Sequence, residues 1–206
     1  MQATADLIRL ALANQDAISW YADAQREIET ICQLENWRSD YFTGILAVTS
    51  PRVACRRNIR IALQYCGTGR FLSNVMRTIK KSVATFEESG EILGPKTSAF
   101  AAALRGDPHA VVLDVHMANL LGVRQSIAFR RKGEIAHWTT TIRETAAACG
   151  MEARAAQACL WFGHKRAIGE NPEAFPIVAE YNNWIGHNRE FPKDGAIMSD
   201  YCDDTF

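Results

Sequence analysis

Lys96 and Asp114 are the two residues in this chain whose types and positions point most directly to chemistry. Lys96 follows a turn containing Gly90 and Gly94 and opens an expected helix, and outward backbone N–H groups at such a start can hold a phosphate oxygen. Asp114 follows the apolar extended run 110–113 and precedes another expected helix, which leaves its carboxylate partly desolvated. If the two segments converge, they form a cleft with one lysine and one carboxylate.

These segments resemble the helix-hairpin-helix DNA glycosylases, the superfamily of endonuclease III and 8-oxoguanine glycosylase. That family carries a hairpin written L-P-G-V-G-x-K-T/V-A, followed at about this distance by V-D-x-H-x. Gly94, Lys96 and Thr97 match the end of the hairpin, and the run Leu113-Asp114-Val115-His116-Met117 matches the aspartate motif, closest to the oxoguanine glycosylase branch. The clear resemblance covers roughly residues 89–122, about a sixth of the chain.

The chain departs from the family pattern inside the hairpin. Glu91 stands at the family's proline, Ile92 stands at its first glycine, and Pro95 precedes the lysine. A carboxylate in a phosphate-binding hairpin is unfavourable for tight duplex binding there. The C-terminus has no four-cysteine cluster, which excludes the iron–sulfur variant of the family.

The resemblance implies an enzyme that excises a damaged or modified base from duplex DNA and also cleaves the abasic site. In that role Asp114 stabilises positive charge on the sugar or activates the nucleophile, and Lys96 attacks C1′ to form a Schiff base. Gly94, Thr97 and His116 are then expected at the DNA, with His116 packing beside the site. The target base must leave the stack, and the wedge candidates are Tyr41, Phe42 and Tyr65. No cofactor, metal or obligate protein partner is inferred.

Each residue also has an ordinary structural interpretation. Asp114 alone is typical of a helix cap, and Lys96 alone is typical of a solvated first turn. Trp161 is most simply a core aromatic residue, although His164 and Lys165 one turn on make it an alternative wall of a base pocket.

Charge is distributed unevenly although the net charge is zero, with 23 basic and 23 acidic residues. Residues 41–86 contain no carboxylate and eight positive charges, and a second basic cluster comprises Arg124, Arg130, Arg131 and Lys132. A one-sided nucleic-acid surface explains this pattern better than solvated helix faces, and it predicts salt-sensitive DNA binding. The arginines expected to bind DNA are Arg52, Arg56, Arg57 and Arg60.

Apolar spacing predicts an all-α protein, and the resemblance implies two helical lobes around a cleft. We expect one compact domain over 1–206, a helix-hairpin-helix element at about 78–105 and an irregular acidic tail at about 190–206. Ser50-Pro51 is expected to open a helix reaching about residue 65. The other helices are expected at 5–13, 17–34, 69–86, 96–104, 114–121, 139–149, 152–165 and from 171–172 to about 184.

Three features of the sequence indicate the compartment in which we expect the protein. It has no run approaching a membrane span and no signal-peptide pattern, and its six cysteines are expected to be reduced thiols. We therefore expect a cytoplasmic protein of a bacterial or phage-infected cell with no membrane partner. Two alternatives to the glycosylase hypothesis stay open: a phage-type enzyme that hypermodifies thymine within DNA on the same scaffold, and a non-catalytic helical DNA-binding protein.

Overall fold

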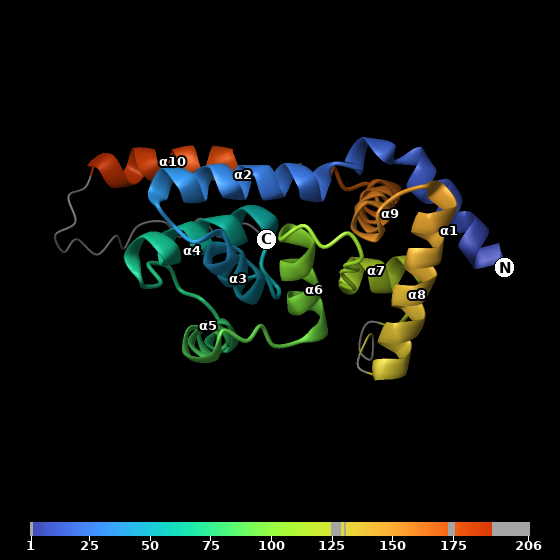
Figure 1. Ribbon diagram of the computed structural model, residues 1–206, viewed down its shortest axis with the longest axis horizontal. Coiled ribbons are helices and arrows are strands. Elements are labelled where there is room, and N and C mark those ends of the chain that lie inside the picture. Colours follow the sequence, from blue (N-terminus) through green and yellow to red (C-terminus); the bar gives the residue numbers. More distant parts are fainter. Residues whose placement is uncertain (1, 125–128, 130, 173–175, 191–206) are drawn as a thin grey trace.

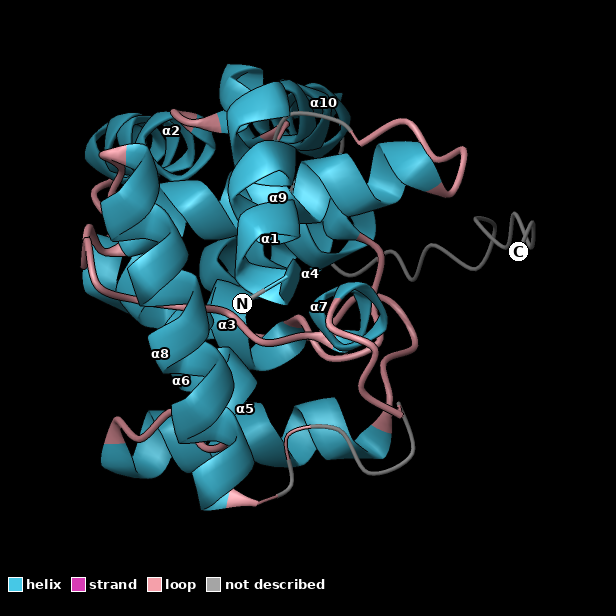
Figure 2. Ribbon diagram, turned by 90° about the vertical axis from the view of Figure 1, so that its right-hand side faces the viewer, coloured by secondary structure: helices cyan, strands magenta, loops and turns pink. Residues whose placement is uncertain are grey.

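The computed structural model of the protein describes residues 2–124, 129, 131–172 and 176–190, and all regular structure in these ranges is helical (Figure 2). The all-α prediction is therefore confirmed. The elements are α1 (Gln2–Ala13), the 3-10 helix η1 (Gln15–Ala17), α2 (Trp20–Glu35), α3 (Ser39–Thr49), α4 (Cys55–Thr68), α5 (Arg77–Ser89), α6 (Pro95–Leu104), α7 (Val115–Leu120), α8 (Lys132–Cys149), α9 (Ala153–Ala167) and α10 (Ile177–Glu190).

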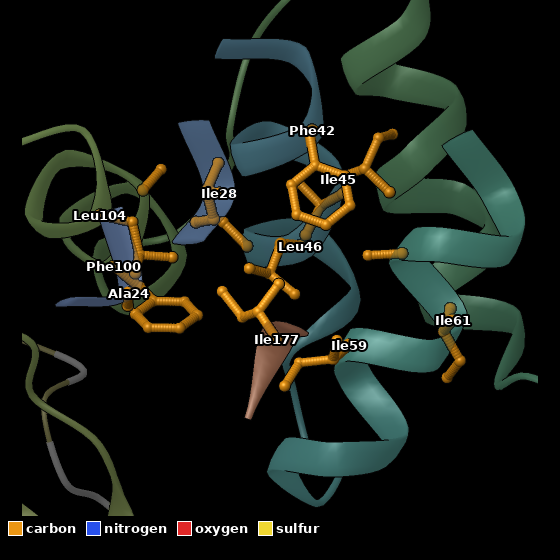
Figure 3. Packing of buried hydrophobic residues seen from close by; sticks show 14 of the residues in the cluster. Ala24, Ile28, Phe42, Ile45, Leu46, Ile59, Ile61, Phe100, Leu104 and Ile177 are labelled. Atoms are coloured by element: carbon orange, nitrogen blue, oxygen red, sulfur yellow. The ribbon is translucent and has the colours of Figure 1, made fainter. Parts of the chain in front are cut away.

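The larger of two hydrophobic clusters surrounds α3. Eight successive residues of this helix, 42–49, are buried, because α2, α4, α5 and α6 all pack against it. Helix α10 runs alongside α2 and packs on α4 (Figure 1). Figure 3 shows Leu46 of α3, Ile59 of α4 and Ile177 of α10 gathered in this cluster. A helix that is apolar on every side thus becomes the centre of the fold.

The second cluster is built from the segments at the other end of the molecule. Helix α9 packs against α1, α7 and α8 (Figure 1). Leu7 of α1, Met117 of α7, Ile142 of α8 and Leu160 of α9 are all buried there. The extended segment before α7 joins the two clusters, since Val112 packs in the first and Val111 in the second.

In the segment where the helix-hairpin-helix element is expected, a short turn joins α5 to α6, and the element itself stays a prediction. Gly90 ends α5 with a φ of 73°, and Gly94 precedes α6 with a φ of 94°, values that suit a residue without Cβ. The hydroxyl of the buried Thr97 donates to the carbonyl oxygens of Leu93 and Gly94, so it closes the turn from inside. The loop that the sequence associated with phosphate binding is therefore braced by its own threonine.

The predicted helix start at Ser50-Pro51 is wrong. Ser50 ends α3 instead, and its hydroxyl donates to the carbonyl oxygen of Ala47 at 2.8 Å. The chain then turns at Arg52, whose φ is 60°, and α4 begins only at Cys55. The buried apolar run 42–49, for which no helix is predicted, forms most of α3, and Ser50 caps the C-terminal end of that helix.

The predicted helix over 69–86 is wrong in its first half. Helix α4 continues through Gly67 to Thr68, and α5 begins at Arg77. Trp184 of α10 packs against the α4 backbone at Gly67, and a Cβ there would lie 2.4 Å from Trp184 Cζ2. The glycine permits close helix packing instead of breaking the helix.

Two further helix starts differ from prediction. Helix α8 starts at Lys132 instead of 139, and α10 starts at Ile177 instead of 171–172, with residues 173–175 outside the described ranges. The acidic tail after residue 190 and Arg130 of the second basic cluster also lie outside the described residues. Within the described ranges, no helix combines the length and hydropathy that a membrane span requires.

Candidate functional site

A cavity of about 490 Å³ lies where the two hydrophobic clusters meet. This volume falls in the range of small-molecule and cofactor sites. Tyr21, Phe100 and Val112 come from the first cluster, and Trp161 and Phe162 are associated with the second. The remaining lining residues are Trp20, Ser50, Arg52, Val53, Ala54, Cys55, Asn58, Lys96, Asp114, Val115, His116, Gln157, Ala158 and Lys165.

Lys96 and Asp114 both line this cavity, so the structure brings together the two residues with predicted catalytic roles. Lys96 is the second residue of α6, and the buried Thr97 and Phe100 of the same helix anchor that end. Asp114 immediately precedes α7 and follows three buried apolar residues. Both side chains are half-buried, a setting in which a lysine amine and a carboxylate can face one ligand.

The Asp114 carboxylate is held by two hydrogen bonds. Its Oδ1 accepts the backbone N–H of Met117 at 2.9 Å, which caps α7. Its Oδ2 accepts the indole N–H of Trp161 in α9 at 3.2 Å. The helix-cap interpretation of Asp114 is thus correct, and the same side chain also lines the cavity.

His116 and Trp161 form the wall beside Asp114. Their rings meet edge to face, with centroids 5.7 Å apart, and the Lys165 ammonium lies 5.2 Å from the Trp161 ring centroid. Burial lowers the pKa of His116; the nearby Asp114 opposes this shift and Lys165 reinforces it. His116 is therefore neutral at pH 7, and its buried Nδ1 has no hydrogen-bond partner among the described residues.

A buried tyrosine–glutamine pair forms another part of the lining. The Tyr21 hydroxyl donates to Gln157 Oε1 at 2.8 Å. Burial raises the pKa of Tyr21 far above its ordinary value, and the negative charge of Asp114 adds to the shift, so Tyr21 remains a donor. The Gln157 oxygen is thereby turned towards Tyr21. Sequence reasoning missed both residues, because neither an alanine-flanked glutamine nor a tyrosine in an amphipathic helix stands out by type or spacing.

The four predicted DNA-binding arginines separate into different environments. Arg52 is exposed and lines the cavity. Arg56 and Arg60 project from α4 and form ion pairs with Glu180, which is 1% exposed. Arg57 donates to the carbonyl oxygen of Asn74 at 3.1 Å. Only Arg52 of the four is at the cavity, and a role for the others at DNA stays a prediction.

Two other predicted DNA contacts, Gly94 and Thr97, lie at the turn before α6 and in its first turn. Gly94 is exposed, immediately before α6, whereas the Thr97 hydroxyl is occupied by carbonyl oxygens of its own turn. A phosphate bound at this turn would therefore contact backbone N–H groups instead of the threonine.

The wedge candidates are not at the cavity. Phe42 is fully buried in the first cluster, so its prediction as a wedge is wrong. Tyr41 donates its hydroxyl to Glu87, and Tyr65 packs on Phe71 with ring centroids 4.7 Å apart. None of the three is among the lining residues. Across the described part of the chain, no cluster of three or more histidine, cysteine or acidic side chains is arranged to hold a metal ion.

Comparison with known proteins places the chain in a family. A model described as "Family of unknown function (DUF7178)" matches residues 10–167. The chain therefore belongs to that family, and the match includes every element that lines the cavity. No curated protein and no solved structure matches the chain.

Proposed function

We propose that this member of the family is a DNA glycosylase with abasic-site lyase activity, acting through Lys96 and Asp114. The observation that carries the proposal is the common cavity: two residues eighteen positions apart in the sequence, on different elements, line one ligand-sized space with aromatic walls. The resemblance in sequence suggests the reaction, and the cavity that both residues line supports their acting on one ligand.

The reaction begins at C1′ of the target nucleotide. The Lys96 amine donates its electron pair to C1′, the N-glycosidic bond breaks, and the base leaves with that bond's electron pair and takes up a proton. Positive charge develops on the sugar as the bond stretches, and the Asp114 carboxylate stabilises it. The nitrogen then loses one of its two protons to solvent, and its electron pair forms a C1′=N bond as the C1′–O4′ bond breaks and O4′ takes up a proton, which gives a protonated Schiff base. Loss of a proton from C2′ expels the 3′ phosphate and cuts the strand.

The cavity walls match a base that has left the helical stack. Trp161 and Phe162 offer aromatic surface for stacking, and Gln157 offers an amide group for hydrogen bonding to a base edge. Arg52 projects at the same cavity and is the side chain best placed to contact the strand that carries the extruded nucleotide. Duplex DNA is thus the proposed partner.

The test is a panel of duplex oligonucleotides, each carrying one modified base. We expect excision of at least one base, lost in Asp114→Asn and retained in Asp107→Asn, in which an exposed aspartate that binds a local turn N–H is changed. Binding without excision of any base would refute the glycosylase proposal in favour of a DNA-binding protein. A gain of mass on thymine-modified DNA without base loss would refute it in favour of a hypermodification enzyme.

A further inference from the structure

We infer that Trp161 is a positioning residue that holds the Asp114 carboxylate for the reaction through its indole N–H. The inference rests on the proposed function and assigns a second role to a residue that sequence reasoning treated as core or pocket wall. Its basis is the hydrogen bond of 3.2 Å from Trp161 Nε1 to Asp114 Oδ2.

The two donors on Asp114 fix the carboxylate plane. One oxygen is held by the Met117 backbone within the turn that opens α7, and the other is held by Trp161, which arrives from α9. A single donor would leave the carboxylate free to rotate about its Cβ–Cγ bond. Two donors from different elements remove that freedom, and positions fixed before the reaction are what electrostatic stabilisation of a cation requires.

The indole ring is itself fixed on several sides. It contacts the ring of Phe162 with centroids 5.6 Å apart as well as the edge of His116. The Lys165 ammonium lies over the ring and forms an ion pair with Glu170. Trp161 is thus held by its neighbours in the orientation that directs its N–H at Asp114.

Both groups that donate to the Asp114 carboxylate are uncharged N–H groups. Among the described residues Asp114 forms no salt bridge, although Lys96 and Lys165 line the same cavity. An ammonium group bound to the carboxylate would cancel most of its charge, whereas an indole N–H orients it and leaves the charge in place. The carboxylate therefore retains its negative charge for the cationic sugar.

The first test is Trp161→Phe, which keeps an aromatic ring and removes the N–H. Because this change removes a hydrogen bond to a charged group, we expect the single-turnover excision rate to fall roughly tenfold or more. The KM for substrate DNA should change less than twofold. In an Asp114→Asn background the same substitution should cost less than a further twofold, because Trp161 acts through the carboxylate. Equal losses in both backgrounds, or a loss confined to KM, would overturn the inference.

The second test does not depend on enzymatic activity, so it separates this inference from the proposed function. The chain has five tryptophans, and in a ¹⁵N-labelled protein the indole N–H resonance that disappears in Trp161→Phe identifies Trp161. In Asp114→Ala we expect that resonance to move upfield and its exchange with solvent to accelerate. Trp138→Phe, a change in a partly buried tryptophan of α8, serves as the matched control and should leave the Trp161 resonance in place. An unchanged Trp161 resonance in Asp114→Ala would overturn the inference even if excision is observed.

Discussion

Glu180 is the residue whose substitution should test the packing of α10 most sharply. Its carboxylate is 1% exposed and accepts from Arg56 Nη1 at 3.1 Å and from Arg60 Nε at 2.6 Å. Glu180→Gln keeps the size of the side chain and removes the charge, so it isolates the two charge-assisted hydrogen bonds that join α10 to α4.

The expected loss follows from these contacts. Two hydrogen bonds to a charged group are worth about 1.5–3 kcal/mol each, which sets an upper range of about 3–6 kcal/mol. Breaking a fully buried ion pair costs about 3–5 kcal/mol because a charge is left buried without a partner. Here the arginine side chains are 47% and 58% exposed, so water solvates them when the carboxylate is lost. The glutamine oxygen also still accepts one bond. We therefore expect a loss of about 2–3 kcal/mol.

Urea unfolding followed by circular dichroism measures this change. The midpoint should fall at an unchanged m-value, and the melting temperature should fall by roughly 5–10 °C for a chain of this size. The matched control is Asp6→Asn, which breaks the ion pair between Asp6 and Arg9; these side chains are 54% and 69% exposed, so the loss should stay below about 1 kcal/mol. If Glu180→Gln costs no more than the control, the inference that a buried carboxylate fastens α10 is wrong.

Three other substitutions test separate parts of the structure. Gly44→Ala would place a Cβ 2.1 Å from Cζ of Phe86 and should lower the free energy of unfolding by about 1–3 kcal/mol in urea titrations, whereas Gly133→Ala, which meets nothing, should not. Burial lowers the pKa of His116 in the folded protein below its ordinary 6.5, so the unfolded chain takes up this proton first as the pH falls below about 6.5. The free energy of unfolding therefore decreases as the pH is lowered through this range, and His116→Gln should flatten that part of the curve of unfolding free energy against pH. Arg52→Ala should reduce the salt dependence of DNA binding by about one counterion, and an unchanged log–log slope would argue against its contact with phosphate.

The sequence predicted those parts of the site that a residue's type and its immediate neighbours indicate together. A glycine turn followed by Lys96, and an apolar run followed by Asp114, are local patterns, and they correctly indicated a helix start after Gly94 and a helix cap at Asp114. That the two would line one cavity depends on how α6 and α9 pack against the segment between them, which is a long-range property. For the same reason Tyr21 and Gln157, separated by 136 positions and joined by a hydrogen bond, left no local signal.

The errors in the fold have a common physical cause. Ser50-Pro51 has the residue types of a helix start, yet the apolar run before it forms the helix because that run packs in the core. Gly67 has the composition of a break, yet the helix continues because Trp184 occupies the space that a side chain would need. In both cases burial against a partner far along the chain outweighed local propensity. Residues 41–86 are rich in arginine, but two of these arginines, Arg56 and Arg60, form ion pairs with Glu180, which lies far along the sequence.

The most direct test of the central claim is to find which residue forms a covalent bond with abasic DNA. The protein is incubated with an abasic duplex and sodium borohydride, and the adduct is digested and mapped by mass spectrometry. Our account predicts an adduct on Lys96, absent in Lys96→Ala and undiminished in Lys81→Ala, where the exposed lysine of α5 is replaced. An adduct on another amine that persists in Lys96→Ala, or no adduct with abasic DNA bound, would contradict the assignment of Lys96 as the nucleophile in the cavity that it shares with Asp114.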